Sequence, residues 1–213
     1  MRLYGYWRST TSFRVRAALN LKGCAFEEVP VDLLAGAQHA PGYVALNPAH
    51  GVPALALADG TVLTQSLAII AYLDAIHPAP RLLPEDPLAK ARVEALSHVV
   101  AMDIHPVNNL RVVDHLHNVF GASQAQAKDW MVHWMTRGFE AAEAMASPDT
   151  EFALGDGPSM ADLCLVAQLY NARRWEVDLA PYPRLRRVEA ACLALPEIAA
   201  AHPDTLKPTE APA

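Results

Sequence analysis

The first third of the chain alternates between short apolar runs and segments whose apolar residues recur at helical spacing. Aromatic and apolar residues over 3–7 predict a strand, and apolar positions on one side of 11–22 predict a helix that Gly23 ends. Residues 26–31 return to an extended apolar pattern and predict a second strand. The order strand, helix, strand predicts a β-α-β unit at the start of the chain.

The next predicted elements are two short strands and a helix. Residues 52–57 and 61–63 carry the apolar residues of two strands, and Asp59-Gly60 between them is typical of a tight turn. Residues 65–76 follow with helical spacing, and a His-Pro pair ends them. Together with the first unit, this pattern predicts a small mixed sheet flanked by helices.

A proline-rich segment then changes the character of the chain. Residues 77–87 contain four prolines in eleven positions, which predicts a stiff, extended linker and a domain boundary. We therefore predict an N-terminal domain over 1–80, a linker over 81–87 and an all-helical domain over 88–213. In the last of these the pattern predicts helices at roughly 87–118, 123–147, 159–175 and 184–195, then a loose tail from Pro203 to Ala213.

Composition and charge exclude several classes of protein. A hydrophobic fraction of 52% with 19% charged residues is ordinary for a folded soluble protein, and the longest apolar runs are far too short to cross a bilayer. The N-terminus lacks the long apolar core of a secretion signal, which predicts a cytoplasmic protein with no membrane partner. The net charge of -6 argues against nucleic acid as the main partner, although locally placed arginines could bind a small anion.

Cysteine and histidine usage predicts that the protein holds no metal. Cys24, Cys164 and Cys192 are widely spaced and form neither a CxxC pair nor a metal knuckle, so we expect reduced core thiols. The nine histidines show no ligand spacing of the HExxH kind.

Four consecutive hydroxyl side chains lie at the start of the first predicted helix. Because serine and threonine are good N-cap residues, helix capping is the favoured explanation of Ser9-Thr10-Thr11-Ser12 when the motif is taken alone. Alternatively, hydroxyl donors and the positive end of the helix together stabilise a bound thiolate. Arg14 and Arg16 would then add positive potential nearby, or else lie on a solvated face.

Two further segments allow both a structural and a ligand-binding interpretation. Val52-Pro53 is compatible with a cis bond that exposes the Val52 backbone to a ligand, although most such bonds are trans. Gln65-Ser66 begins a helix, where Ser66 either caps the helix or, with the first helix amides, receives a carboxylate.

Seven segments spread over nearly the whole chain carry a family likeness: Arg8–Leu19, Ala45–Pro48, Gly51–Leu55, Gln65–Ile70, Asp103–Asn109, Met160–Val166 and Val177–Pro183. Their order and content resemble the glutathione transferases, in particular the zeta class, which includes maleylacetoacetate isomerase and the bacterial maleylpyruvate isomerases. The resemblance implies a thioredoxin-like N-terminal domain followed by an all-helical transferase C-terminal domain, hence an α/β plus all-α fold. Thr11 stands where the class signature often has cysteine, so any role of that cysteine is absent here.

The resemblance also implies which residues bind glutathione. Ser9, Thr10 and Thr11 would surround its sulfur and form the catalytic segment. The other glutathione-binding residues would be Gln38, Val52 through its backbone, Gln65 and Ser66 at the γ-glutamyl end, and His105 and Asn109 from the helical domain. His105 precedes a proline, so packing at a helix kink explains it equally well.

The substrate carboxylates would bind to Arg8, Arg111 and Arg174, because the planar fork of arginine matches a carboxylate with two hydrogen bonds. Arg173 competes with its neighbour Arg174 for that role. For Asp162, three residues after Ser159, the resemblance supports a role in folding and not in the active site.

The implied reaction is the cis-trans isomerisation of a maleyl ketoacid, maleylacetoacetate or maleylpyruvate, in the breakdown of aromatic compounds. Reversible addition of the glutathione thiolate turns the double bond into a single bond that can rotate, and glutathione is regenerated. Two alternatives stay open: a transferase or α-haloacid dehalogenase that releases the adduct, and a non-catalytic transferase-like module for protein association. The resemblance also implies a homodimer.

Overall fold

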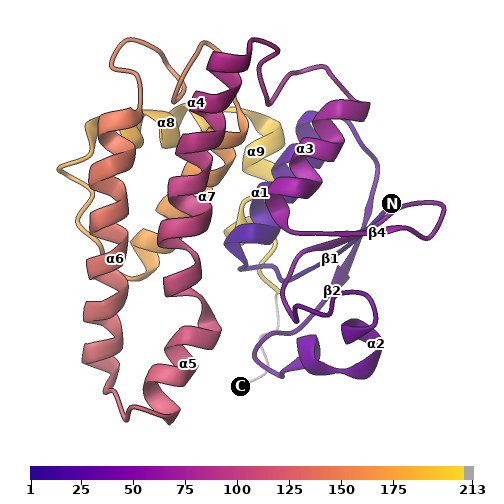
Figure 1. Ribbon diagram of the computed structural model, residues 1–213, viewed down its shortest axis with the longest axis vertical. Helices are drawn as coiled ribbons and strands as arrows, with labels where there is room; N and C mark the ends of the chain where they lie inside the picture. Colours follow the sequence, from indigo (N-terminus) through magenta and orange to yellow (C-terminus); the bar gives the residue numbers. More distant parts are fainter. Residues whose placement is uncertain (209–213) are drawn as a thin grey trace. The chain divides into compact units, whose positions relative to one another are not determined.

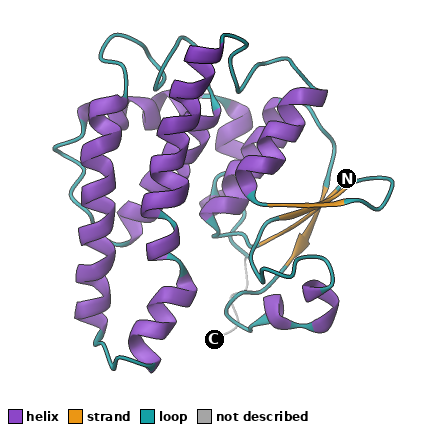
Figure 2. Ribbon diagram, in the orientation of Figure 1, coloured by secondary structure: helices purple, strands orange, loops and turns teal. Residues whose placement is uncertain are grey.

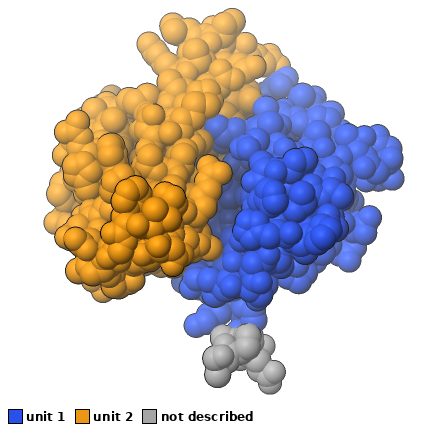
Figure 3. Space-filling view, turned by 60° about the horizontal axis from the view of Figure 1, so that its bottom comes forward, with its two compact units in different colours: residues 1–82, 193–213 blue, residues 83–192 orange. Residues whose placement is uncertain are grey.

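The structure is a computed structural model, and it describes residues 1–208 of the chain. These residues divide into two compact units, one of residues 1–82 with residues 193–208 and one of residues 83–192 (Figure 3). The strands belong to the first unit, whereas residues 83–192 form helices and their connections (Figure 2). The α/β plus all-α architecture predicted from the sequence is confirmed.

The first unit contains a four-stranded mixed sheet in the order β2-β1-β3-β4 (Figure 1). β1 (Arg2–Gly5) pairs in parallel with β2 (Glu27–Pro30) and antiparallel with β3 (Ala54–Ala56), which pairs antiparallel with β4 (Val62–Thr64). Parallel neighbours need a crossover connection, and α1 (Thr10–Leu21) supplies it between β1 and β2. The predicted β-α-β unit is therefore present.

The helices α1 and α3 (Ser66–Ile76) run in the same direction (Figure 1). Two side-chain contacts fix their register: Arg14 Nη1 donates to Ser66 Oγ at 3.4 Å, and Lys22 Nζ donates to Asp74 Oδ1 at 2.6 Å. Both pairs are separated by 52 residues in the chain. Because equal steps along the two helices keep their residues in contact, the helices are parallel and their N-termini lie at the same end of the unit.

Residues 193–208 pack with the first unit, whereas the sequence analysis assigns them to a helical domain over 88–213. α9 (Pro196–Ala200) contacts α1, where Asn20 Nδ2 donates to Glu197 O at 2.9 Å. Arg16 Nε on the same helix donates to Ala201 O at 3.3 Å. These contacts join residues far apart in the chain, so local periodicity gave no indication of them.

Hydrogen bonds also form in two segments that the sequence predicts to be a stiff linker and a loose tail. In the proline-rich segment, Pro80 O accepts a hydrogen bond from Lys22 Nζ, and Leu82 N donates to Asp74 Oδ1 at 2.7 Å. The predicted tail begins with a 3₁₀ turn over Pro203–Thr205. The remainder of that tail, residues 209–213, lies outside the described residues.

In chain order, the helical elements of the second unit are α4 (Pro87–His98), the π-helix η2 (Val99–Ile104), the 3₁₀ turn η3 (Pro106–Asn108), α5 (Leu110–Asn118), α6 (Gln124–Met145), α7 (Met160–Arg174) and α8 (Pro183–Ala194). The sequence pattern predicts one helix over roughly 87–118, but η2 and η3 interrupt it around Pro106. Proline has no N–H to continue the helix, and its ring crowds the preceding turn. Over residues 1–208, no helix combines the length and apolarity needed to span a bilayer.

Asp162 has the folding role expected for it. Its carboxylate is fully buried at the start of α7 and accepts hydrogen bonds from Ala153 N at 2.7 Å, Ser159 N at 2.8 Å and Ser159 Oγ at 2.6 Å. Together with Ser159 it forms a capping box, and it ties the preceding loop to the helix. Burial raises the pKa of this carboxyl, and the three hydrogen bonds oppose that shift.

Candidate functional site

The hydroxyl segment lies at the N-terminus of α1, and Ser9 is the N-cap residue. Its backbone is extended, and its Oγ accepts a hydrogen bond from Ser12 N at 3.2 Å. The capping interpretation is therefore confirmed for Ser9. Ser12 is fully buried, and its Oγ accepts from Tyr6 N at 3.3 Å, which ties the chain after β1 to α1.

The hydrogens of the Ser9 and Thr11 hydroxyls can be assigned from their partners. Thr11 Oγ1 donates to Val52 O at 2.8 Å, because a carbonyl oxygen can only accept. Ser9 Oγ lies 2.8 Å from Thr11 Oγ1. Since Thr11 has already used its one hydrogen, Ser9 is the donor in this contact. A thiolate beside the segment would compete with Thr11 Oγ1 for the Ser9 hydrogen, while the Thr11 hydroxyl remains hydrogen-bonded to Val52 O.

Thr10 differs from both neighbours. It is the first residue of α1, and its side chain is buried. The three predicted catalytic hydroxyls therefore have unequal surroundings, and Ser9 is the one whose hydrogen a ligand can redirect most simply.

The N-termini of α1 and α3 together make one end of the first unit electropositive. Each helix N-terminus carries about half an elementary charge, and the two helices point the same way. In a chain of net charge -6, this is a local feature against the overall field. Thiolates and carboxylates are the groups that such helix ends favour.

The connection before β3 is held rigidly. Val52-Pro53 is a cis peptide, as the sequence allows. Tyr43 Oη and Asn47 Nδ2 both donate to Gly51 O, the second at 2.7 Å. Burial raises the pKa of the Tyr43 phenol, so it remains a neutral donor. With the Thr11 hydroxyl on the next carbonyl, two successive carbonyls before the proline have side-chain donors.

Gln38 lies in the 3₁₀ turn η1 (Ala37–His39), just before the short helix α2 (Pro41–Val44). Its Nε2 lies 3.2 Å from His39 Nε2. Its Oε1 is buried and has no hydrogen-bond partner in the part of the chain that the structure describes. A buried amide oxygen is normally hydrogen-bonded, so this acceptor fits a ligand N–H.

Gln65 and Ser66 begin α3 in an unusual way. Gln65 is the N-cap residue, has φ of 68° and makes no side-chain capping bond. A left-handed backbone is rare for a residue with a long side chain and is a common feature of ligand sites. Ser66 is the first helical residue and is buried. Since Ser66 is not the N-cap residue, the capping interpretation of the sequence does not account for its hydroxyl.

Arg14 and Arg16 are almost completely buried, at 1% and 2% exposure, so neither lies on a solvated face. The spacing of the two arginines already indicates that they do not share a solvated face. Residues two apart in a helix point about 200° away from each other, so one solvated face could not hold both. Arg16 donates to Trp7 O at 2.9 Å and pairs with Glu28 at 3.4 Å, whereas Arg14 contacts Ser66.

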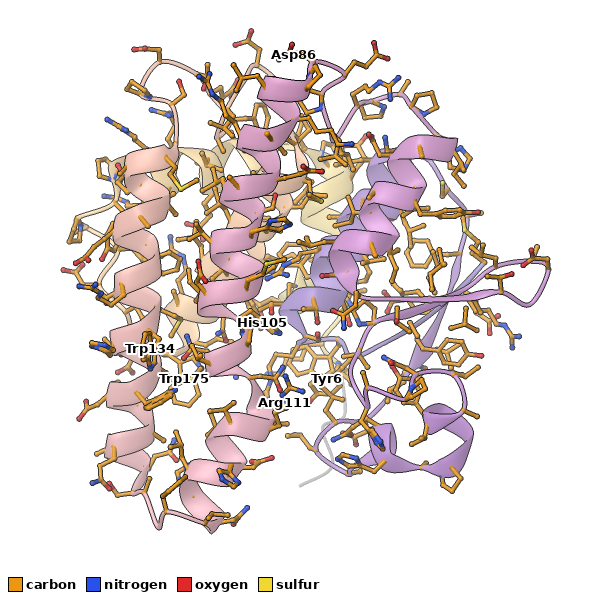
Figure 4. All side chains as sticks on the ribbon, in the orientation of Figure 1. Tyr6, Asp86, His105, Arg111, Trp134 and Trp175 are labelled. Atoms are coloured by element: carbon orange, nitrogen blue, oxygen red, sulfur yellow. The ribbon has the colours of Figure 1, made fainter. Side chains whose placement is uncertain are left out.

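In the second unit, His105 and Asn109 lie together where η2 gives way to α5. Asn109 is the N-cap residue of α5, and its Oδ1 accepts from Arg111 N at 3.2 Å. Its Nδ2 lies 3.3 Å from His105 Nε2. Because the amide NH₂ is a donor, His105 accepts through Nε2 in this contact. The side chains of His105 and Arg111 both come from this η2–α5 segment (Figure 4).

Arg8 is held by aromatic rings. Its guanidinium carbon lies 5.5 Å from the ring centre of Trp7 and 6.0 Å from that of Tyr6. Such cation–π contacts use the face of the guanidinium and leave its edge donors for an anion. Arg8 forms no ion pair with a carboxylate of residues 1–208.

The choice between Arg173 and Arg174 is narrowed by Glu189. Arg173 Nε donates to Glu189 Oε1 at 3.0 Å, and its Nη2 donates to the other oxygen, so its fork is filled. The hydrogen bonds to Glu189 raise the pKa of Arg173. Arg174 is exposed at the end of α7 and donates from Nη1 to Asn171 Oδ1 at 3.2 Å. Arg111 is also exposed.

The three cysteines are free thiols. Cys164 and Cys192 are buried core residues, as expected, and burial raises the pKa of Cys192 well above its usual value. Cys24 is only half-buried. Within residues 1–208, no cluster of three or more histidine, cysteine or acidic side chains is arranged to hold a metal ion.

Comparison with known proteins finds a glutathione S-transferase domain in each of the two units. The glutathione S-transferase N-terminal domain matches residues 1–75, and the glutathione S-transferase C-terminal domain matches residues 135–191. The maleylacetoacetate isomerase of Rhizobium meliloti (strain 1021) is 51% identical over 208 residues, 97% of this chain and 97% of that protein.

Two solved structures are similar to this chain. One is the holo form of a maleylpyruvate isomerase described as a bacterial zeta-class glutathione S-transferase, with 43% identity, a TM-score of 0.94 and coverage of 99% and 100% of the two chains. The other is the maleylacetoacetate isomerase of Anaeromyxobacter dehalogenans 2CP-1 with bound dicarboxyethyl glutathione and citrate. It has 42% identity, a TM-score of 0.85 and coverage of 99% and 94%.

Proposed function

This chain belongs to the zeta class of glutathione transferases, and from that premise we propose that it is a glutathione-dependent cis-trans isomerase of maleyl ketoacids. Its substrate is maleylacetoacetate or maleylpyruvate, and its product is the fumaryl isomer. When bound, glutathione supplies a thiolate that adds to the double bond, permits rotation about the resulting single bond, and is released unchanged.

The observation that carries the proposal is the hydroxyl arrangement at the N-terminus of α1. Thr11 is fixed on Val52 O, and Ser9 donates to Thr11 with a hydrogen that a thiolate can attract. A hydroxyl donor and a helix N-terminus both lower the pKa of a nearby thiol. Ser9 would therefore hold the sulfur as thiolate, with Thr11 as its fixed support and Thr10 beside it.

The residues of the first unit fit the rest of a glutathione molecule. The unpartnered Oε1 of Gln38 can accept from a peptide N–H, and we assign the Val52 backbone before the cis proline to the tripeptide as well. Gln65 and Ser66 at the N-terminus of α3 suit the charged γ-glutamyl end. We assign His105 and Asn109 of the second unit to glutathione as well, on the class resemblance and their mutual contact.

We assign the substrate carboxylates to Arg8, Arg111 and Arg174. Arg8 is oriented by two aromatic rings, and the filled fork of Arg173 favours Arg174 over its neighbour. The relative from Anaeromyxobacter holds dicarboxyethyl glutathione and citrate in its active site, so a site of this class accepts glutathione that carries a dicarboxyethyl group. We further propose that the protein is a homodimer, as the class resemblance implies. We also propose that it is cytoplasmic, because its cysteines are free thiols, as expected in a reducing compartment.

The proposal is tested by following both maleyl substrates spectrophotometrically with a fixed amount of glutathione. We expect many turnovers per glutathione, with total glutathione constant, and the faster substrate identifies the physiological class. Glutathione consumption in proportion to product from an α-haloacid, without turnover of either maleyl compound, would contradict the proposal. Light scattering of the purified protein tests the dimer independently.

A further inference from the structure

Arg14 is a buried cation with no buried anion beside it. The side chain is 1% exposed, and its one hydrogen bond goes from Nη1 to the neutral Ser66 Oγ at 3.4 Å. Nε and Nη2 have no partner among residues 1–208, and no carboxylate of these residues pairs with Arg14. A charge removed from water without a counter-charge is strongly unfavourable.

Arg16 shows that a buried arginine in helix α1 need not lack a counter-charge. Two residues further along, Arg16 is equally buried, at 2% exposure, but it is compensated. Two backbone carbonyls accept its hydrogen bonds, and the Glu28 carboxylate lies at 3.4 Å. The same helix therefore holds one buried arginine with a full set of partners and another whose anion is missing.

The position of Arg14 suggests the missing anion. The Arg14–Ser66 contact lies one turn into α1 and at the first residue of α3, about 12 Å along the helices from the Lys22–Asp74 ion pair. The guanidinium therefore lies beside the N-terminus of α3 and adds a full positive charge to the partial charge of that helix end.

The contact also directs the hydroxyl hydrogen of Ser66. A guanidinium can only donate, so Ser66 Oγ accepts from Arg14. The hydrogen of Ser66 is then left for another acceptor. A hydroxyl donor with its hydrogen left over, a helix N-terminus and a buried cation make a combination that is suited to a carboxylate.

We infer that Arg14 is a positioning residue for the γ-glutamyl α-carboxylate of glutathione, which it orients through Ser66 and whose charge compensates its own. The inference rests on the proposed function, because that function supplies the ligand. It makes Arg14 a specificity residue: the buried charge favours ligands with a carboxylate at this end and disfavours ligands without one.

The test compares glutathione with an analogue that lacks this carboxylate, γ-aminobutyryl-cysteinyl-glycine, by calorimetric titration. We expect the wild-type protein to bind the analogue at least about tenfold more weakly than glutathione. Arg14→Met should bind glutathione about tenfold more weakly than wild type and should discriminate little between the two ligands. Arg14→Lys, which keeps the charge, should retain part of the discrimination, and Ser66→Ala should lose it as Arg14→Met does.

Thermal unfolding without ligand separates positioning from a structural role. Because the methionine removes an uncompensated buried charge, ligand-free Arg14→Met should be at least as stable as wild type. The control Arg16→Met leaves Glu28 without its partner and should be less stable, with discrimination between the two ligands unchanged. An Arg14→Met protein that fails to fold, or that discriminates as wild type does, overturns the inference. Wild-type protein that does not bind glutathione overturns the proposed function as well, so the two failures are distinguishable.

Discussion

At the scale of single residues, the chemistry depends on where each hydroxyl hydrogen goes. The sequence offers Ser9, Thr10, Thr11 and Ser12 as equivalent donors. In the structure Ser12 accepts from Tyr6 N, and Thr11 donates to Val52 O. Ser9 combines an N-cap contact with a hydrogen that a thiolate can attract. This difference arises from contacts with residues distant in the chain, which a run of similar letters cannot indicate.

Replacement of Ser9 tests this assignment. In Ser9→Ala the bound thiolate loses one charge-assisted hydrogen bond, worth about 1.5–3 kcal/mol, so the pKa of bound glutathione should rise by about one to two units. The rate at neutral pH should fall by about 10–100-fold and recover as the pH rises. Ultraviolet absorbance of the thiolate, titrated in the complex, measures the shift.

Two controls separate this effect from helix capping. Glycine is nearly as good an N-cap residue as serine, so Ser9→Gly should lose the hydroxyl with less loss of stability than Ser9→Ala. Ser9→Thr restores a hydroxyl and should restore most of the activity. A bound thiol pKa that is equal in wild type and Ser9→Gly would assign the thiolate to another donor.

At the scale of secondary-structure elements, polar residues at helix ends decide much of the local structure. The sequence predicts the start of α7 well, because Ser159 and Asp162 have capping-box spacing. It predicts the region before α5 poorly. There a π-helix brings the buried Ile104 so close to α6 that a Cβ at Gly138 would lie 2.1 Å from Ile104 Cγ1. Local periodicity carries no information about such packing between elements.

Asp162→Asn provides the test at this scale. The carboxylate accepts from both Ala153 N and Ser159 N, one on each oxygen. An asparagine has one oxygen, so its NH₂ must face one of these donors. We expect a loss of about 1–3 kcal/mol in the free energy of unfolding, measured by urea titration. The exposed Asp156→Asn in the preceding loop makes the same chemical change and should change stability by less than about 0.5 kcal/mol. Equal stability of the two variants would contradict the capping role.

At the scale of the whole molecule, the sequence predicts the two-part architecture but not the packing of residues 193–208 with the first unit. The proline-rich segment marks the first boundary, whereas the return of α9 to α1 depends on contacts such as Asn20 with Glu197. The predicted site residues share the same limitation. The helix starts at Ser9 and at Gln65-Ser66 follow from local motifs, but the burial of Arg14 depends on a contact 52 residues away. Capping and other motifs within one helix turn can be predicted from the sequence, whereas the tertiary contacts of a side chain cannot.

The assignment of the substrate carboxylates is tested by a matched pair of arginines at the end of α7. Arg174→Ala should leave the affinity for glutathione nearly unchanged and raise the KM of the maleyl substrate by about 10–100-fold, because a charge-assisted contact to a carboxylate is lost. Arg173→Ala removes the partner of Glu189, so it should lower stability and leave KM close to wild type. Steady-state kinetics with saturating glutathione, and thermal unfolding of both variants, measure the two effects. If KM rises in Arg173→Ala and not in Arg174→Ala, the two residues have the opposite roles. That outcome would require the Arg173–Glu189 fork to open for the substrate.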